Sequence, residues 1–269
     1  MNKAYPTYKQ ALSLLLIWLV CIAVCALPVI LHFSIDNAIG LAILYTLSMT
    51  LTVVIGLSIR KNWRLEISSF PVIIIFIAIL SVLSCHIILE PLQTIIPISE
   101  TLLKLFRNIH DQPYAFFFMA VMAAPLLEEI LFRGIILDGF LKNYKPWHAI
   151  IASALVFALI HGNLTQGIGA FALGILFGWI YWNTNSIIPC ILLHLINNLI
   201  AFVGNLASTE KDINQSLREA ISNDIVYGLL YVFSILTAAG SVYVIQKKYF
   251  SKIQSTKVMQ QNEVEITRV

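Results

Sequence analysis

The stretch "APLLEEILFRGIIL", residues 124–137, places Glu128, Glu129 and Arg133 inside an otherwise apolar run. A charged side chain at the centre of a membrane helix costs roughly 2.5–3.5 kcal/mol on insertion scales. Glu129 and Arg133 are four residues apart, so one face of a helix can pair them. Glu128 points about 100° away around the helix and is left without that partner. Pro125 removes a backbone hydrogen bond beside Glu128, and Gly134 is expected to let another helix approach closely.

The composition of the chain around this stretch is that of a membrane protein. Of 269 residues, 59% are hydrophobic and 12% are charged, against about 25% charged in soluble domains, and the mean hydropathy is +0.84. Several apolar runs reach the roughly 20 residues that a span requires, and no alternating barrel pattern is present. We expect an all-α, polytopic transmembrane bundle of about eight spans. The predicted helices cover residues 11–32, 37–59, 69–89, 113–141, 147–163, 166–183, 187–206 and 224–246.

The distribution of basic residues predicts the orientation of the bundle. With the N-terminus inside, twelve Lys and Arg fall in inner segments and four in outer segments, as the positive-inside rule requires. Both termini are then cytoplasmic. The net charge of +3 gives no indication of nucleic-acid binding. We divide the chain into a cytoplasmic N-terminus (1–10), N-terminal helices plus an amphipathic interfacial segment (11–112), a core (113–206), a last loop and helix (207–250) and a polar cytoplasmic tail (251–269).

Two further helices carry reactive side chains at a depth similar to that of Glu128. "FALIHG" places Phe157 and His161 on one face, and "HLINN" does the same for His194 and Asn198. At 1.5 Å per residue, Glu128 and His161 lie about 21 and 22 Å from the inner ends of their helices, and His194 and Asn198 about 12 and 18 Å. A single membrane histidine or asparagine is more often a packing residue, but the combination predicts a site.

Other polar and sulfur-containing residues are left without a role. His32, His86, His110 and His148 lie near predicted helix ends or in loops. The four cysteines, Cys21, Cys25, Cys85 and Cys190, lie in apolar runs and are interpreted as free thiols.

The charged stretch around Glu128 and the two polar motifs at Phe157–His161 and His194–Asn198 resemble motifs of the CPBP family of intramembrane proteases. This family includes type II CAAX prenyl endopeptidases and bacterial lysostaphin resistance protein A-like proteins. The family's EExxxR, FxxxH and HxxxN motifs read here as Glu128 to Arg133, Phe157 to His161, and His194 to Asn198. They cover roughly residues 113–206. The resemblance implies a catalytic cavity open to the membrane or the cytosol, and it favours a bacterial cell membrane as the location.

The resemblance also implies roles for the site residues. Glu128 and His161 would activate water, His194 and Asn198 would form an oxyanion site, and Glu129, Arg133 and Phe157 would support them. The substrate would be a membrane-associated or lipid-modified peptide or protein. Glu128, His161 and His194 also form a His₂Glu set that suits zinc, but HExxH is absent, so metal-dependent and metal-free mechanisms both stay open.

Two alternatives to a peptidase stay open as well. The charged residues could fix helix packing in a catalytically silent immunity or scaffold protein of the same fold. Glu128 and His161 could instead form the proton relay of a small transporter.

Overall fold

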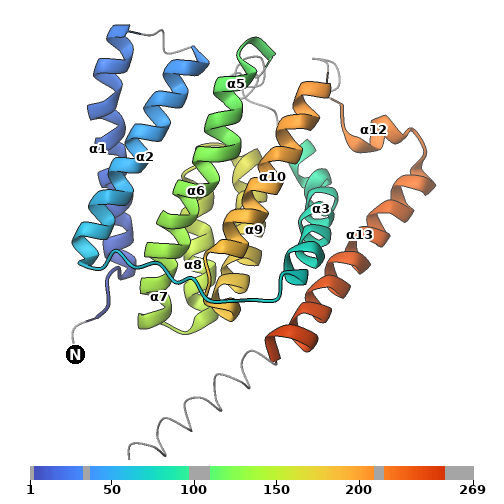
Figure 1. The fold of residues 1–269 in the computed structure, drawn as a ribbon. Helices are drawn as coiled ribbons and strands as arrows, with labels where there is room; N and C mark the ends of the chain where they lie inside the picture. The colour runs from blue at the N-terminus through green and yellow to red at the C-terminus, as the bar shows by residue number, and fades with distance from the viewer. Residues whose placement is uncertain (1–2, 33–36, 97–109, 209–214, 252–269) are drawn as a thin grey trace, which may run out of the picture.

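The structure is a computed structural model, which describes residues 3–32, 37–96, 110–208 and 215–251. These residues form a helical bundle (Figure 1) in which the one β-type pairing is an isolated bridge between Ile67 and Ser186. Seven helices are long and apolar enough to cross a membrane. The protein is therefore an integral membrane protein with an all-α fold.

The spans follow the predicted ranges closely. They are α1 Tyr8–His32, α2 Ala38–Arg60, α3 Ile73–Thr94, a 31-residue helix Pro113–Asn143, α9 Leu164–Thr184, α10 Ile188–Ala207, and α13 Asp224–Val244 continued by η3 Ile245–Phe250. The 31-residue helix consists of α5 Pro113–Phe116, η1 Phe117–Ala123, α6 Ala124–Glu129, η2 Ile130–Leu137 and α7 Asp138–Asn143. A short helix, α12 Leu217–Ile221, precedes α13.

One predicted span is shorter than expected. The helix expected at 147–163 is α8, Pro146–Leu159, which has 14 residues and is too short to cross a bilayer alone. The next helix, α9, begins directly after Asn163. The Asn163 side chain accepts a hydrogen bond from the backbone N–H of Gln166 and so caps the start of α9. The described residues thus hold seven candidate spans where about eight were predicted.

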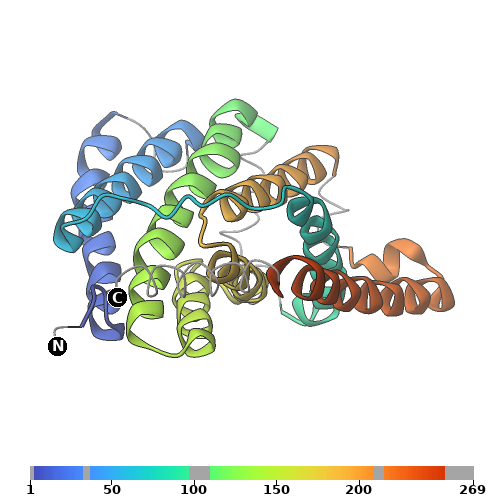
Figure 2. The ribbon, with the colours of Figure 1, turned by 60° about the horizontal axis from the view of Figure 1, so that its bottom comes forward.

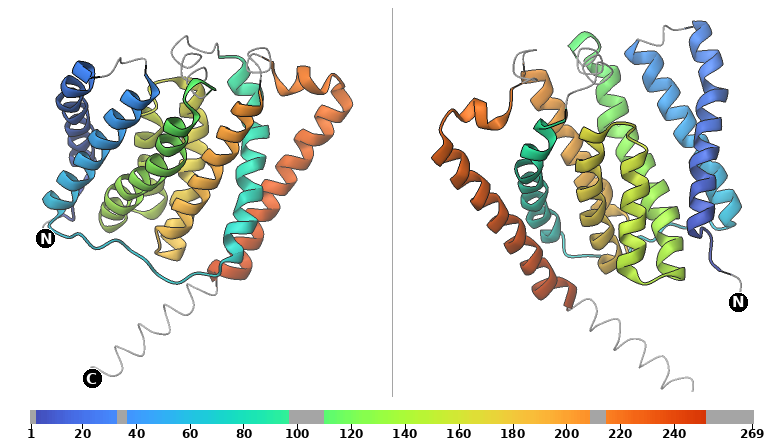
Figure 3. Two further views of the ribbon diagram at one scale, coloured as in Figure 1. Left: turned by 45° about the horizontal axis from the view of Figure 1, so that its top comes forward. Right: turned by 180° about the vertical axis from the view of Figure 1, so that it is seen from behind.

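The helices lie in an order that places the 31-residue helix at the centre. Figures 1 and 2 show α1 and α2 at one edge and α3 with α13 at the other, and α6 to α10 lie between them. Seen from behind, α8 and α9 stand side by side (Figure 3). Buried residues make up more than half of α9 and little of α13, because α13 presents most of its apolar surface to lipid.

The connection between α2 and α3, residues 61–72, crosses one end of the bundle in an extended conformation (Figure 1). It is held to the α9–α10 turn by hydrogen bonds from Ile187 N to Glu66 O (2.9 Å) and from Ser68 N to Asn185 O (3.3 Å). A Cβ on Gly134 would lie 2.8 Å from Leu65 of this connection. The close neighbour of Gly134 is therefore this extended segment, and the expectation of another helix there was wrong.

The described N-terminal residues pack on α7 and on Tyr144, which follows it. The Asn143 side chain accepts from Ala4 N (3.0 Å) and donates to Ala4 O (2.6 Å), and the Tyr8 and Tyr144 rings stack. Helix α1 begins at Tyr8, three residues before its predicted start.

Two predicted segments extend beyond the described residues. In the amphipathic segment, residues 90–94 continue α3 with Pro91 inside the helix, and 97–109 are not described. Most of the tail (252–269) is not described either, so both locations stay predictions.

Candidate active site

The two glutamates lie on α6, between two stretches with wider, π-helical turns, η1 and η2. Such turns interrupt the regular backbone bonding of a helix and are frequent at functional sites. Three carbonyls of η1 and η2 accept side-chain hydrogen bonds: Ala120 from Asn198 (2.8 Å), Phe132 from Ser153 (3.3 Å) and Gly134 from Arg60. The wide turns thus bind the central helix to α10, α8 and α2.

Glu129 and Arg133 form the predicted ion pair, which is confirmed. Their Oε1 and Nη1 atoms are 2.7 Å apart, and the residues are 0% and 1% exposed. The guanidinium also faces Gly174 O of α9 (3.4 Å) and lies over the rings of Phe157 and Phe177. This burial is tolerable because the cation has a carboxylate partner and aromatic faces around it.

His194 of α10 lies between the two glutamates. Its Nδ1 is 2.8 Å from Glu129 Oε1, and its Nε2 is 3.8 Å from Glu128 Oε2. A carboxylate only accepts hydrogen bonds, so His194 Nδ1 carries a proton when Glu129 is ionised. The Nε2 atom is then directed toward Glu128, and the first and third motifs meet as the sequence predicts.

Glu128 has a partner that sequence reasoning missed. The phenol of Tyr45, on α2, donates a 2.5 Å hydrogen bond to Glu128 Oε1. Glu128 is 7% exposed, so its carboxylate lies inside the bundle. It faces the imidazole of His194 and is not directed into lipid.

His161 lies in the turn after α8, so the expectation that it belongs to the helix was wrong. Its Nδ1 is 2.9 Å from Phe157 O. A carbonyl only accepts, so Nδ1 holds the proton and Nε2 is free in the neutral ring. The Phe157 ring meets the imidazoles of His161 and His194 edge-on, at centroid distances of 5.1 and 5.9 Å.

Asn198 belongs to a chain of polar side chains on α10 and α3. Its amide nitrogen donates to Ala120 O (2.8 Å), and its amide oxygen accepts from Asn197 (3.0 Å). Asn197 Oδ1 lies 2.8 Å from His86 Nε2. His86 is well inside α3, so its expected place near a helix end was wrong.

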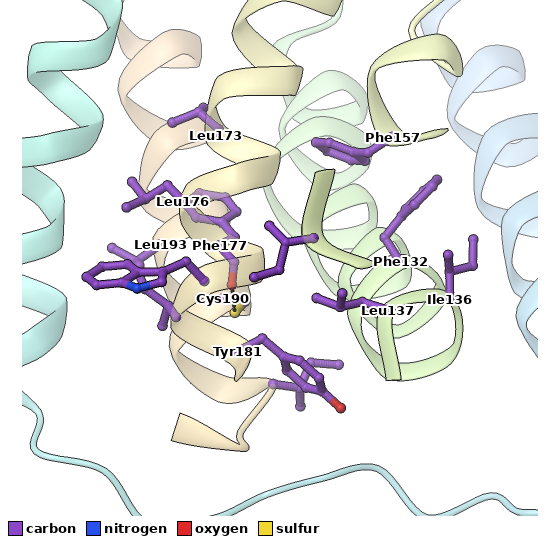
Figure 4. Packing of buried hydrophobic residues seen from close by; sticks show 14 of the residues in the cluster. Phe132, Ile136, Leu137, Phe157, Leu173, Leu176, Phe177, Tyr181, Cys190 and Leu193 are labelled. Atoms are coloured by element: carbon purple, nitrogen blue, oxygen red, sulfur yellow. Dashed lines mark hydrogen bonds between the residues drawn. The ribbon is translucent and has the colours of Figure 1, made fainter. Parts of the chain in front are cut away.

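Apolar packing beneath the polar cluster fixes the helices that carry it. Figure 4 shows Phe132, Phe157, Phe177 and Leu193 among the buried side chains of this core. A Cβ on Gly174 would lie 3.0 Å from Ala154 Cβ, so α9 approaches α8 closely at this position.

The cysteines behave as predicted from their apolar surroundings. All four are free thiols. Cys190 donates from Sγ to Phe177 O at 3.2 Å, a contact also drawn in Figure 4.

The zinc hypothesis was tested on the positions of the possible ligands. Among the described residues, no group of three or more His, Cys, Asp or Glu side chains is arranged to hold a metal ion. The Nδ1 atoms of His161 and His194 contact Phe157 O and Glu129, so their Nε2 atoms are the possible ligands. Among the described residues these atoms are not grouped with Glu128 into a His₂Glu centre, and we derive no step through a metal.

Two open cavities lie elsewhere in the molecule. One, of about 600 Å³, is lined by residues of α1, α8 and the α7–α8 turn such as Tyr8, Tyr144 and His148. The other, of about 500 Å³, lies between Glu90 of α3 and the α12–α13 region. Neither is lined by the paired glutamates, so the catalytic cavity stays a prediction.

Comparisons with known proteins agree with the three motifs. A family model described as type II CAAX prenyl endopeptidase Rce1-like matches residues 110–200, a range that contains all three motifs. No solved structure matches the chain significantly.

Two curated bacterial proteins are similar in sequence. The membrane-embedded CAAX protease MroQ of Staphylococcus aureus is 26% identical over 190 residues, which cover 62% of this chain and 74% of that protein. A protein named membrane peptidase YdiL of Bacillus subtilis is 28% identical over 94 residues, or 35% of this chain and 38% of that protein. The motifs, the helical bundle and these similarities all agree with a resemblance to the CPBP family of CAAX protease-like membrane peptidases, which is carried by residues 110–200.

Proposed function

We propose that this protein is an intramembrane endopeptidase that hydrolyses peptide bonds of membrane-associated or lipid-modified peptides or proteins. The observation that carries the proposal is the meeting of Glu128 and His194, 3.8 Å apart and both buried. Burial of two ionisable side chains in a membrane bundle is costly, and the network of contacts around them gives each a defined orientation.

Glu128 and His161 are the proposed activators of water. Glu128 Oε2 has no hydrogen bond from the described residues, and His161 Nε2 is left free by the Phe157 contact. Either atom can take a proton from water as its oxygen attacks the scissile carbonyl carbon. The same proton then passes to the leaving amine as the C–N bond breaks.

His194 and Asn198 are the proposed donors to the oxyanion. Asn198 uses one amide hydrogen on Ala120 O, and the second remains for a substrate. His194 donates from Nε2 when both its nitrogens are protonated, and this cation has a carboxylate on each side. Donors in a water-poor site contribute strongly to the stabilisation of a developing charge.

The test is cleavage of a library of prenylated, acylated and unmodified peptides by the purified protein in lipid vesicles. Glu128→Gln and His161→Ala are expected to lower kcat by about 10²- to 10⁴-fold, and Asn198→Ala by about 10²- to 10³-fold, with melting temperatures retained. Glu219→Gln and His148→Ala, at exposed positions outside the cluster, are the matched controls.

Three other outcomes would contradict or refine the proposal. Loss of folding in all the site variants would favour the packing alternative, and proton-coupled flux without cleavage would favour a transporter. Cleavage measured with a chelator, and again after zinc is returned, decides whether the reaction uses a metal.

A further inference from the structure

The contact between Tyr45 and Glu128 joins the N-terminal helices to the motif-bearing core. The two residues are 83 positions apart, and the phenol donates to Glu128 Oε1 at 2.5 Å. Helix α2 packs along η1, α6 and η2 of the central helix. Tyr45 lies outside residues 110–200, which the family model matches, and outside all three motifs.

This hydrogen bond divides the two oxygens of Glu128 between different neighbours. Oε1 accepts from Tyr45, and Oε2 faces His194 Nε2 at 3.8 Å. Within the described part of the chain, no other hydrogen bond reaches this carboxylate. The terminal torsion of a glutamate is broad, so its rotamer alone does not fix the carboxylate plane. The Tyr45 donor removes that freedom and directs Oε2 toward His194.

Tyr45 is well suited to act as a fixed donor. Its ring packs against the buried core, and the backbone that carries it is regular helix between Ala38 and Arg60. A tyrosine side chain has only two rotatable bonds before the ring, so little freedom remains once the ring is packed. A catalytic group must be held within about 0.5 Å and 10–20° of its productive position.

We propose that Tyr45 is a positioning residue that orients the carboxylate of Glu128 for the activation of water. The inference rests on the proposed peptidase function. It assigns to α2, which lies outside the motif-bearing helices, a direct part in arranging the reacting groups.

The first test is Tyr45→Phe, which keeps the ring and removes the donor. We expect kcat to fall about ten- to a hundredfold, the size of one hydrogen bond to a charged group. KM should stay within about twofold, because the contact does not touch substrate. Tyr45→Met is a second donor-free variant if the phenylalanine variant folds poorly.

The second measurement does not depend on activity. The infrared carboxyl or carboxylate band of Glu128 is identified as the band that disappears in Glu128→Gln. It should shift in Tyr45→Phe, because its hydrogen bond is lost. The matched control is Tyr231→Phe, which removes a phenol that donates to Ile88 O between α13 and α3; it should leave both the band and kcat unchanged.

The outcomes separate this inference from the function it rests on. An active wild type whose kcat and Glu128 band are unchanged in Tyr45→Phe overturns the inference alone. An equal loss of kcat in Tyr231→Phe overturns it too, since the loss then reflects helix packing in general. A wild type that cleaves no peptide overturns the proposed function and, with it, a positioning role.

Discussion

At the scale of single residues, the buried pair of Glu129 and Arg133 has the clearest energetic consequence. Arg133→Met should lower the free energy of unfolding by about 3–5 kcal/mol, because it leaves a fully buried carboxylate without its cationic partner. Unfolding in mixed micelles with increasing SDS measures the change. The double variant Arg133→Met with Glu129→Gln is the control, since it removes the uncompensated charge and should regain part of the lost stability.

A small effect would contradict this account of the pair. Exposed ion pairs contribute at most about 1 kcal/mol to stability. If the free energy of unfolding of Arg133→Met differs from that of the wild type by no more than this, His194 alone is sufficient to compensate the charge of Glu129. The distances of 2.7 Å to Arg133 and 2.8 Å to His194 from the same oxygen, Oε1, lead us to expect that both partners are needed.

At the scale of helices, the glycines of the bundle differ in whether a neighbouring helix occupies the space that an added Cβ would take. A Cβ on Gly174 would meet Ala154 at 3.0–3.1 Å, whereas nothing lies within 4 Å of a Cβ on Gly204. Gly174→Ala should therefore lower stability by about 1–3 kcal/mol through overpacking of α8 on α9. Gly204→Ala should raise it by up to about 1 kcal/mol, because alanine is the better helix former.

Both variants replace glycine by alanine. If the free energy of unfolding falls in one and rises in the other, the difference isolates the effect of packing. A stabilising Gly174→Ala would mean that α8 moves aside at little cost. Since α8 ends two residues before His161, such a variant should be assayed for cleavage as well.

At the scale of the whole molecule, basic residues gather at one end of the bundle. The N-terminus, the 61–72 connection and the α7–α8 turn lie together at the bottom of Figure 1, as does the end of α13. These segments and the helix ends beside them contain nine of the eleven described Lys and Arg, whereas Arg133 is buried in the central helix and Arg218 of α12 lies at the opposite end. We predict that the basic end is cytoplasmic.

Single-cysteine labelling in intact cells tests this orientation. With the four native cysteines replaced, Ser222→Cys should react with a membrane-impermeant maleimide, and Lys61→Cys should react only after the cells are opened. Both positions are exposed turns with positive φ, so they differ in side and not in accessibility. The reverse labelling pattern would show that the bundle is inverted.

Features that depend on residues close together in the chain could be predicted from the sequence, and contacts between distant residues could not. The spans and the Glu129–Arg133 pair follow from local rules, namely hydrophobic length and the i,i+4 geometry of a helix. The early end of α8 was missed because the Asn163 cap competes with a continuous apolar run. The partner of Gly134 was missed because an extended connection, and not a helix, fills the space above it.

The sequence by itself determined that this chain is a helical membrane protein, and it predicted which polar residues lie at a similar depth, since hydropathy and helical rise need no knowledge of neighbours. Only the tertiary structure decided that His194 stands between both glutamates and that Tyr45 holds Glu128. These contacts join residues 65 and 83 positions apart. They depend on how each helix is rotated and packed against the next, and no local pattern in the chain specifies that rotation.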